Sequence, residues 1–177
     1  MAHANWALDK AHSHVGFSVR HMMISNVRGN FENFDATVSA DTSDLSTAAI
    51  SVTIDPTSIN TGNADRDNHL KSADFFKAEE HPHIKFESTK LTYHGGEEHK
   101  LEGHLTLLGT QKPITLNCEI TGPAKDPWGN DRIGVVATGS INRNDFGLSY
   151  NSVLEAGGVL IGETVKLNVE VEFVKQA

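Results

Sequence analysis

The feature that most constrains this chain is an alternation of apolar and polar residues with period two. Ile50, Val52 and Ile54 are each followed by a polar residue, and the same pattern runs through 101–107 and 165–173. Successive side chains of a strand point to opposite faces, so each of these segments has one dry face and one wet face. This arrangement is typical of antiparallel sheet and indicates an all-β protein.

The alternation predicts nine strands, which are separated by turns containing Gly, Asn or Asp. These strands cover residues 5–9, 12–22, 27–40, 48–55, 83–93, 100–108, 112–122, 132–142 and 159–174. A polar stretch near residues 63–73 breaks the pattern, and its Asp and Asn residues suit the cap of one short helix. Strands that are dry on one side close into a barrel or form a sandwich, and long strands favour the barrel.

The length and charge of the chain limit its architecture and its partners. Its 177 residues fit a single domain, 1–177. The formal net charge is −8 and the basic residues occur singly, so we expect no nucleic-acid partner. The N-terminus shows no basic segment before an apolar stretch, and no segment approaches the ~20 apolar residues of a membrane span. These features predict a cytoplasmic protein without stable membrane insertion, or a periplasmic one if a leader was removed.

Motifs that carry catalysis are missing from the sequence. It contains no Gly-x-Ser-x-Gly elbow, no phosphate-binding Gly-rich loop with Lys and no His-Glu-x-x-His. Cys118 is the only cysteine, and its parity places it on the apolar face with Leu116 and Ile120. Burial disfavours the thiolate, so we interpret Cys118 as a structural thiol. We therefore predict no catalytic residues.

Ten histidines raise the alternative of a metal site. His12 and His14 lie two apart on a predicted strand, and His94 and His99 flank a Gly-containing turn in a spacing that allows them to face each other across a hairpin. Structural zinc needs about four well-placed ligands, and local spacing fixes no such set. Solvated histidines are the simpler interpretation, so we predict no metal ligands and no cofactor beyond a bound lipid.

The order of seven short motifs along the chain resembles that of the YceI-like family of isoprenoid-binding proteins. The motifs are Trp6-x-Leu8-Asp9-x-x-His12-Ser13, Gly29-x-Phe31, Ser58-Ile59-x-Thr61-Gly62, Arg66-Asp67-x-His69-Leu70, Pro82-x-Ile84-x-Phe86, Gly103-x-Leu105-Thr106-Leu107 and Asn142-Arg143-x-Asp145-Phe146-Gly147. The resemblance implies an eight-stranded antiparallel lipocalin-like barrel with one short helix. It also implies a long apolar pore that holds a polyisoprenoid chain or a quinone tail, and no catalysis.

The alternation and the resemblance together assign the ligand-binding side chains to the apolar interior. The predicted residues are Val15, Phe17, Val19, Phe31, Val52, Ile54, Phe75, Phe76, Phe86, Leu105, Leu107, Leu116, Ile141, Phe146, Leu167, Val169 and Val171. The motifs also share polar residues that either contact a head group or tie the loops to the barrel end: His12, Ser13, Asp67, His69, Arg143 and Asp145. Because buried polar groups must be paired where loops close a barrel, the tying role is favoured.

Three functions remain open on these grounds. The first is a non-catalytic carrier for a long isoprenoid-type lipid, either a polyprenyl chain or a quinone tail. The second is a histidine-bearing metal-binding or stress-response protein, and the third is an enzyme acting on a prenyl substrate. We expect an apolar small molecule as the partner, and a homodimer remains open.

Overall fold

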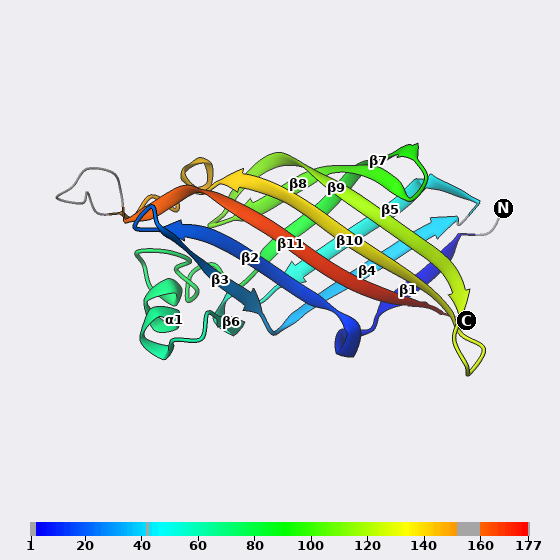
Figure 1. Ribbon diagram of the computed structural model, residues 1–177, viewed down its shortest axis with the longest axis horizontal. Helices are drawn as coiled ribbons and strands as arrows, with labels where there is room; N and C mark the ends of the chain where they lie inside the picture. The colour runs from blue at the N-terminus through cyan, green and yellow to red at the C-terminus, as the bar shows by residue number, and fades with distance from the viewer. Residues whose placement is uncertain (1–2, 42, 152–159, 177) are drawn as a thin grey trace.

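A single antiparallel sheet closes on itself in the computed structural model, which describes residues 3–41, 43–151 and 160–176 (Figure 1). Its strands are β1 (Ala4–Leu8), β2 (His14–His21), β3 (Ser25–Phe31), β4 (Phe34–Asp41), β5 (Asp44–Ile54), β6 (Ile59–Asn60), β7 (Ile84–Gly95), β8 (Glu98–Leu107), β9 (Thr110–Lys125), β10 (Asp131–Asn142) and β11 (Ile161–Lys175). The helical segments are α1 (Ala64–Lys71) and the 3-10 turns η1 (Lys10–His12), η2 (Pro56–Ser58) and η3 (Arg143–Phe146).

Strand β11 closes the barrel. It pairs with β10 on one side, and on its other side with both β1 and β2. β1 and β2, separated by η1, therefore occupy one wall position of the barrel between them. β4 pairs with β1 and β3 pairs with β2, so β3 and β4 together occupy the neighbouring wall position. Eight wall positions result, which confirms the predicted eight-stranded antiparallel barrel.

The predicted short helix is confirmed as α1, and it lies at one end of the barrel (Figure 1). Asn63 caps it, because the Asn63 side chain accepts a hydrogen bond from the Arg66 amide at 3.0 Å. None of the helix residues is buried. α1, η2 and β6 belong to the stretch between Ile54 and Ile84, where β5 has ended and β7 has not begun. We call this the α1 end of the barrel, and the opposite end the β1 end.

Two predicted strands differ from the observed ones where other groups hydrogen-bond to the backbone: one is split, and the other begins later. The predicted strand 27–40 is split, because the Glu32 amide donates to the Ser58 carbonyl at 3.2 Å and Asn33 accepts from the Asp55 amide at 2.9 Å. The predicted strand 12–22 begins only at His14, after the η1 turn that Asp9 caps. The start of the predicted strand 159–174 lies outside the described residues.

Burial follows the predicted alternation along the wall. Leu101, Leu105 and Leu107 of β8 are each 8 % exposed or less, whereas Glu102 lies on the exposed face. Gly103 shares the inner face and leaves room for a neighbour, since a Cβ there would lie 2.5 Å from the ring of Phe86. Inward-pointing apolar side chains from the wall strands thus form the interior that the sequence predicts.

Candidate functional site: an apolar cavity inside the barrel

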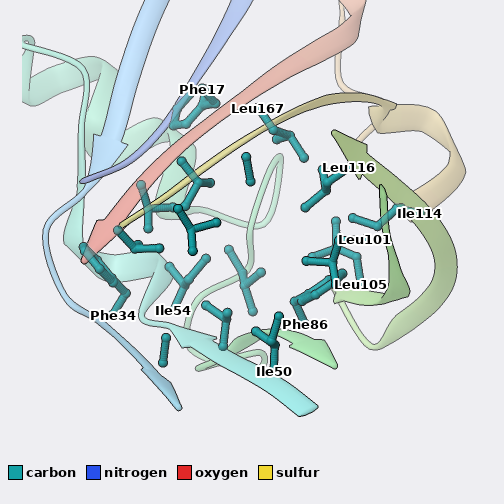
Figure 2. A pocket seen from close by; sticks show the side chains of 18 of the residues that line it. Phe17, Phe34, Ile50, Ile54, Phe86, Leu101, Leu105, Ile114, Leu116 and Leu167 are labelled. Atoms are coloured by element: carbon teal, nitrogen blue, oxygen red, sulfur yellow. The ribbon is translucent and has the colours of Figure 1, made fainter. Parts of the chain in front are cut away.

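A cavity of about 270 Å³ lies inside the barrel. Its wall exposes apolar atoms alone, and they come from the wall strands, from the segment that follows α1 and from η3 with the residues after it. Figure 2 shows Phe17 and Leu167 on one side of this space, with Ile50, Ile54 and Phe86 on the other. A space of this kind accepts hydrocarbon and offers no hydrogen bond to a polar guest.

The structure brings nearly all of the predicted ligand-binding side chains together on this wall. They are Val15, Phe17, Val19, Phe31, Val52, Ile54, Phe75, Phe76, Phe86, Leu105, Leu107, Leu116, Ile141, Leu167, Val169 and Val171. Phe146 is the exception: it belongs to η3, where period-two parity does not apply, and it is 2 % exposed in the core without lining the cavity. Contact between these side chains and a ligand stays a prediction.

Several wall residues were missed because the interruption between β3 and β4 shifts the parity. In an unbroken strand, Phe31 and Phe34 point to opposite faces. The break at 32–33 adds an odd step, so both residues face the cavity, as do Ala36 and Val38. Other missed wall residues keep the expected parity and were detectable from it, such as Ile50, Leu101, Ile114 and Ile120.

Aromatic side chains cover the cavity at the α1 end. Phe75 and Phe76 line it, and Phe31 contacts Phe76 edge to face with ring centroids 5.9 Å apart. His69 lies edge-on to both Phe75 and Tyr150, each at 5.0 Å. Phe75 and Tyr150 are themselves 5.2 Å apart, so the three rings form one cluster. The cluster closes this end with side-chain contacts rather than with strand pairing.

Arg143 is the one charged residue that lines the cavity among the described residues, and it is 3 % exposed. Its guanidinium donates to backbone carbonyls: Nε to Gly162 at 2.8 Å, Nη1 to Tyr150 at 2.9 Å and to Leu148, and Nη2 to Ile161 at 3.4 Å. Burial lowers the pKa of Arg143. Arg143 therefore ties two chain segments together and turns its aliphatic stem toward the cavity.

The other polar residues of the shared motifs, in α1 and beside η1, also form hydrogen bonds within the protein. Asp67 accepts from the Thr61 amide at 2.9 Å and from the Thr61 hydroxyl at 2.5 Å. The His69 ring lies 2.8 Å from a carboxylate oxygen of Asp74. The Ser13 hydroxyl donates to the Asp9 carbonyl at 2.7 Å. These contacts fit the tying role that the sequence favoured over head-group binding.

A cluster of charged groups lies at the other end of the barrel, where Asp9, His12 and Glu172 bring possible metal ligands within 4.8 Å of one another. Arg132 occupies the same place, with Nη1 at 2.8 Å from Asp9 and 3.3 Å from Glu172, and Nε at 2.8 Å from Asp126. Hydrogen bonds from His12 and Arg132 lower the pKa of Asp9, and Asp9 raises that of His12. The arrangement is an ion-pair network in which Arg132 already pairs with all three carboxylates.

Two expectations about the histidines are wrong. His12 does not share a strand face with His14, because it belongs to η1 and its Nδ1 lies 2.9 Å from Asp9. His99 does not face His94, because the register places it opposite Tyr93, with ring centroids 5.3 Å apart. An irregularity in the pairing of β7 with β8 near this turn displaces His94 from that position.

The prediction for Cys118 is confirmed. The side chain is 3 % exposed and belongs to the core cluster. Burial raises the pKa of the Cys118 thiol to about 11, so the thiolate is scarce near neutral pH.

Comparison with known proteins places this barrel in a family. The model of the YceI-like domain matches residues 6–173. The chain belongs to the YceI-like family. A relative in this family, UPF0312 protein SA2479 of Staphylococcus aureus (strain N315), is 42 % identical over 170 residues, which are 96 % of each chain.

Solved structures share the YceI-like barrel. The Campylobacter jejuni YCEI protein is 38 % identical over 96 % of both chains, with a TM-score of 0.77. A polyisoprenoid binding domain from Saccharophagus degradans has a TM-score of 0.71, and the match covers 97 % of this chain and 98 % of that domain. Its sequence identity is 17 %, so this second likeness concerns the fold.

Proposed function

We propose that the protein is a non-catalytic carrier that holds a long isoprenoid-type lipid, such as a polyprenyl chain or a quinone tail, inside the barrel. The observation that carries the proposal is a cavity whose exposed wall is apolar throughout. Membership of the YceI-like family and the barrel shared with a polyisoprenoid binding domain support it. In the described residues, no helix is long and apolar enough to cross a membrane.

Burial of the tail supplies the binding energy in this proposal. Each methylene group removed from water contributes about 0.8 kcal/mol, before the entropy of ordering the tail is subtracted. An engineered apolar cavity of about 150 Å³ binds benzene. By that comparison, the 270 Å³ found here holds roughly two five-carbon units, and a longer tail requires wall side chains to change rotamer.

The chemistry of the wall favours binding over catalysis. Among the described residues, the wall carries no carboxylate, imidazole or hydroxyl side chain that acts as an acid, a base or a nucleophile. The guanidinium of Arg143 is engaged by carbonyl groups, and the Cys118 thiol has a raised pKa. A bound lipid would therefore be released chemically unchanged.

Lipid extraction from purified protein tests this function. We expect organic extracts of the wild type to contain a molecule with repeating five-carbon units, identified by mass spectrometry. Leu105→Lys places an ammonium group on the apolar wall and should abolish occupancy. Thr106→Lys is the matched control, because Thr106 lies on the opposite face of the same strand.

A cavity-filling variant keeps the test informative if Leu105→Lys unfolds. Ala137 lines the cavity and is 6 % exposed, so Ala137→Leu fills part of the space with hydrocarbon and leaves the wall apolar. We expect this variant to retain shorter tails than the wild type does. Equal occupancy by the same lipid in wild type, Leu105→Lys and Ala137→Leu would overturn the proposal.

A further inference from the structure

The turn between β2 and β3 presents three consecutive large apolar side chains to solvent. Met22 is 43 % exposed, Met23 is 51 % exposed and Ile24 is 78 % exposed. We call these three residues the hairpin tip. Single exposed apolar side chains are ordinary on protein surfaces, but a contiguous group marks an interaction site.

The backbone conformation of the hairpin tip is unfavourable for its two methionines. Met22 and Met23 have φ values of 53° and 64°, in the left-handed region that disfavours residues with a Cβ. The turn is closed by a hydrogen bond from the Ile24 amide to the His21 carbonyl, 3.2 Å long. Asn and Gly are the favoured residues at such positions in a hairpin. Two large apolar side chains here cost stability, which indicates a role for the side chains outside the fold.

The strands that carry the hairpin tip are locally cationic, although the chain has a net charge of −8. Residues 14–31, which form β2, the hairpin tip and β3, contain Arg20 and Arg28 and no Asp or Glu. Arg20 and Arg28 are exposed, and Arg20 Nη2 donates to the Met23 carbonyl at 2.6 Å. Apolar side chains flanked by cationic ones match an anionic lipid surface, where insertion and electrostatic attraction act together.

The hairpin tip also lies at the end of the barrel that strand pairing leaves incomplete. Residues 25–29 of β3 pair with β2 alone in the described part of the chain. Val19, on the strand leading to the tip, and Ile161, opposite His21 on β11, both line the cavity. Figure 1 shows the β2–β3 turn at the α1 end. A surface bound at the tip would therefore lie next to the cavity.

We propose that the hairpin tip is a reversible docking element for an anionic lipid membrane, which brings the α1 end of the cavity to the bilayer for lipid transfer. The choice of a membrane as the partner rests on the proposed carrier function, because an isoprenoid tail resides in a bilayer. The net charge of the whole chain opposes such binding, so the acid-free hairpin determines which face approaches the membrane. The apolar side chains of the tip then enter the interface.

Sedimentation with phosphatidylcholine vesicles, with and without phosphatidylglycerol, tests this proposal. We expect the wild type to bind the vesicles that contain phosphatidylglycerol. The variant Met22→Asn/Met23→Gly/Ile24→Ser removes the apolar side chains and should weaken this binding about tenfold or more. Because it installs favoured turn residues, its Tm should stay the same or rise. Arg28→Gln should reduce binding only to vesicles that contain phosphatidylglycerol.

Trp128→Ser is the matched control, since Trp128 is 80 % exposed in the β9–β10 turn, away from the α1 end. It should leave vesicle binding unchanged. The proposal is overturned if the wild type does not bind, if the hairpin-tip variant binds as well as the wild type, or if Trp128→Ser binds as poorly as the hairpin-tip variant. It is also overturned if the tip instead mediates self-association, seen as a dimer in light scattering that the hairpin-tip variant dissolves.

Loading from detergent separates this proposal from the carrier function. If the hairpin-tip variant takes up a prenyl quinone from detergent as the wild type does, but receives it slowly from vesicles, both proposals are supported. If neither protein takes up the quinone while the wild type still binds vesicles, the carrier function fails and docking stands.

Discussion

The two ends of the barrel are closed by different means. At the β1 end the sheet is continuous, because β1 pairs with β4 on one side and with β11 on the other. Trp6, Ile133 and Phe173 form a small buried cluster there. At the α1 end, part of β3 lacks a second partner strand among the described residues, and the cover consists of α1 and the rings of Phe75 and Tyr150. The α1 end is therefore the part that side-chain movement can open.

Two arginines show the same contrast. Arg132, toward the β1 end, bonds to three carboxylates, whereas Arg143, toward the α1 end, bonds to backbone carbonyls of 148–150 and 161–162. Carboxylates titrate and carbonyls do not. The difference predicts that acid loosens the first end and leaves the ties at the second intact, which makes the two ends separable by experiment.

Replacement of Arg143 should have the largest effect on stability. Arg143→Met leaves several buried carbonyls without a donor, and we expect the free energy of unfolding to fall by about 3–5 kcal/mol. Arg143→Lys should recover only part of this loss, because one ammonium cannot reach four carbonyls in the geometry of a guanidinium. Urea unfolding measures both values. A loss below about 1 kcal/mol in Arg143→Met would show that water replaces these ties readily.

Truncation of one aromatic ring at each end should separate the effect on stability from the effect on ligand passage into and out of the cavity. Phe75→Ala and Phe173→Ala each remove a buried ring that lines the cavity, and each should cost about 3 kcal/mol. If the α1 end is the entrance, only Phe75→Ala should also accelerate release of a bound fluorescent fatty or prenyl probe, followed by stopped flow. Equal acceleration in both variants would contradict the difference between the ends.

Replacement of Arg132 should have a smaller effect that depends on pH. Arg132→Met removes the cation that three carboxylates share, and we expect Tm to fall by only a few degrees, because the network reaches solvent. Hydrogen bonds with His12 and Arg132 lower the pKa of Asp9, and hydrogen bonds led by the one from Arg132 lower the pKa of Asp126. The contribution of both carboxylates is therefore present above the ordinary value of 3.8 and is lost as pH falls through the folded pKa. The Tm difference between wild type and variant should therefore narrow below about pH 4.

His12 acts in the opposite direction within the same network. Its pKa is raised by Asp9, so its contribution is present below the ordinary value of 6.5 and is lost as pH rises through the folded pKa. The network therefore contributes most to stability between pH 3.8 and pH 6.5, the ordinary pKa values of Asp and His, and Tm measured across this range tests this expectation. A Tm difference that stays constant from pH 3 to pH 9 (roughly the span of these titrations) would mean that Arg132 acts through packing alone.

The sequence predicted the wall well because alternation is a local property. Leu105 and Val169 face the cavity for the same reason that they alternate with polar residues. Phe34 was missed because the break before it depends on Ser58 and Asp55, which bond to the chain at 32–33 from a distant segment. Local parity contains no information about such a bond.

Local sequence patterns could not predict the polar contacts at the two ends for a similar reason, because these contacts join residues far apart in the sequence. Arg132 and Asp9 are separated by 123 residues, and nothing near either one indicates its partner. Arg143 was identified as a shared residue, but a charged side chain on an apolar wall is not predicted by hydrophobic alternation. Its position follows from carbonyls that only the folded chain brings together.

The last prediction uses cysteine labelling, which measures access to the two ends rather than stability. Cys118 pairs in register with His99, which is itself 8 % exposed, so this thiol reports on the closed part of the barrel. With a pKa of about 11, about one thiol in a thousand is ionised at pH 8, and labelling should be at least about a hundredfold slower in the native than in the denatured protein. Ile161→Cys in a Cys118→Ala background places a matched thiol on the cavity wall at the α1 end. It should label faster than Cys118, and the gap should widen with Phe75→Ala, because that change opens only the end where Ile161 lies. Equal labelling rates at the two positions would show that the ends open together.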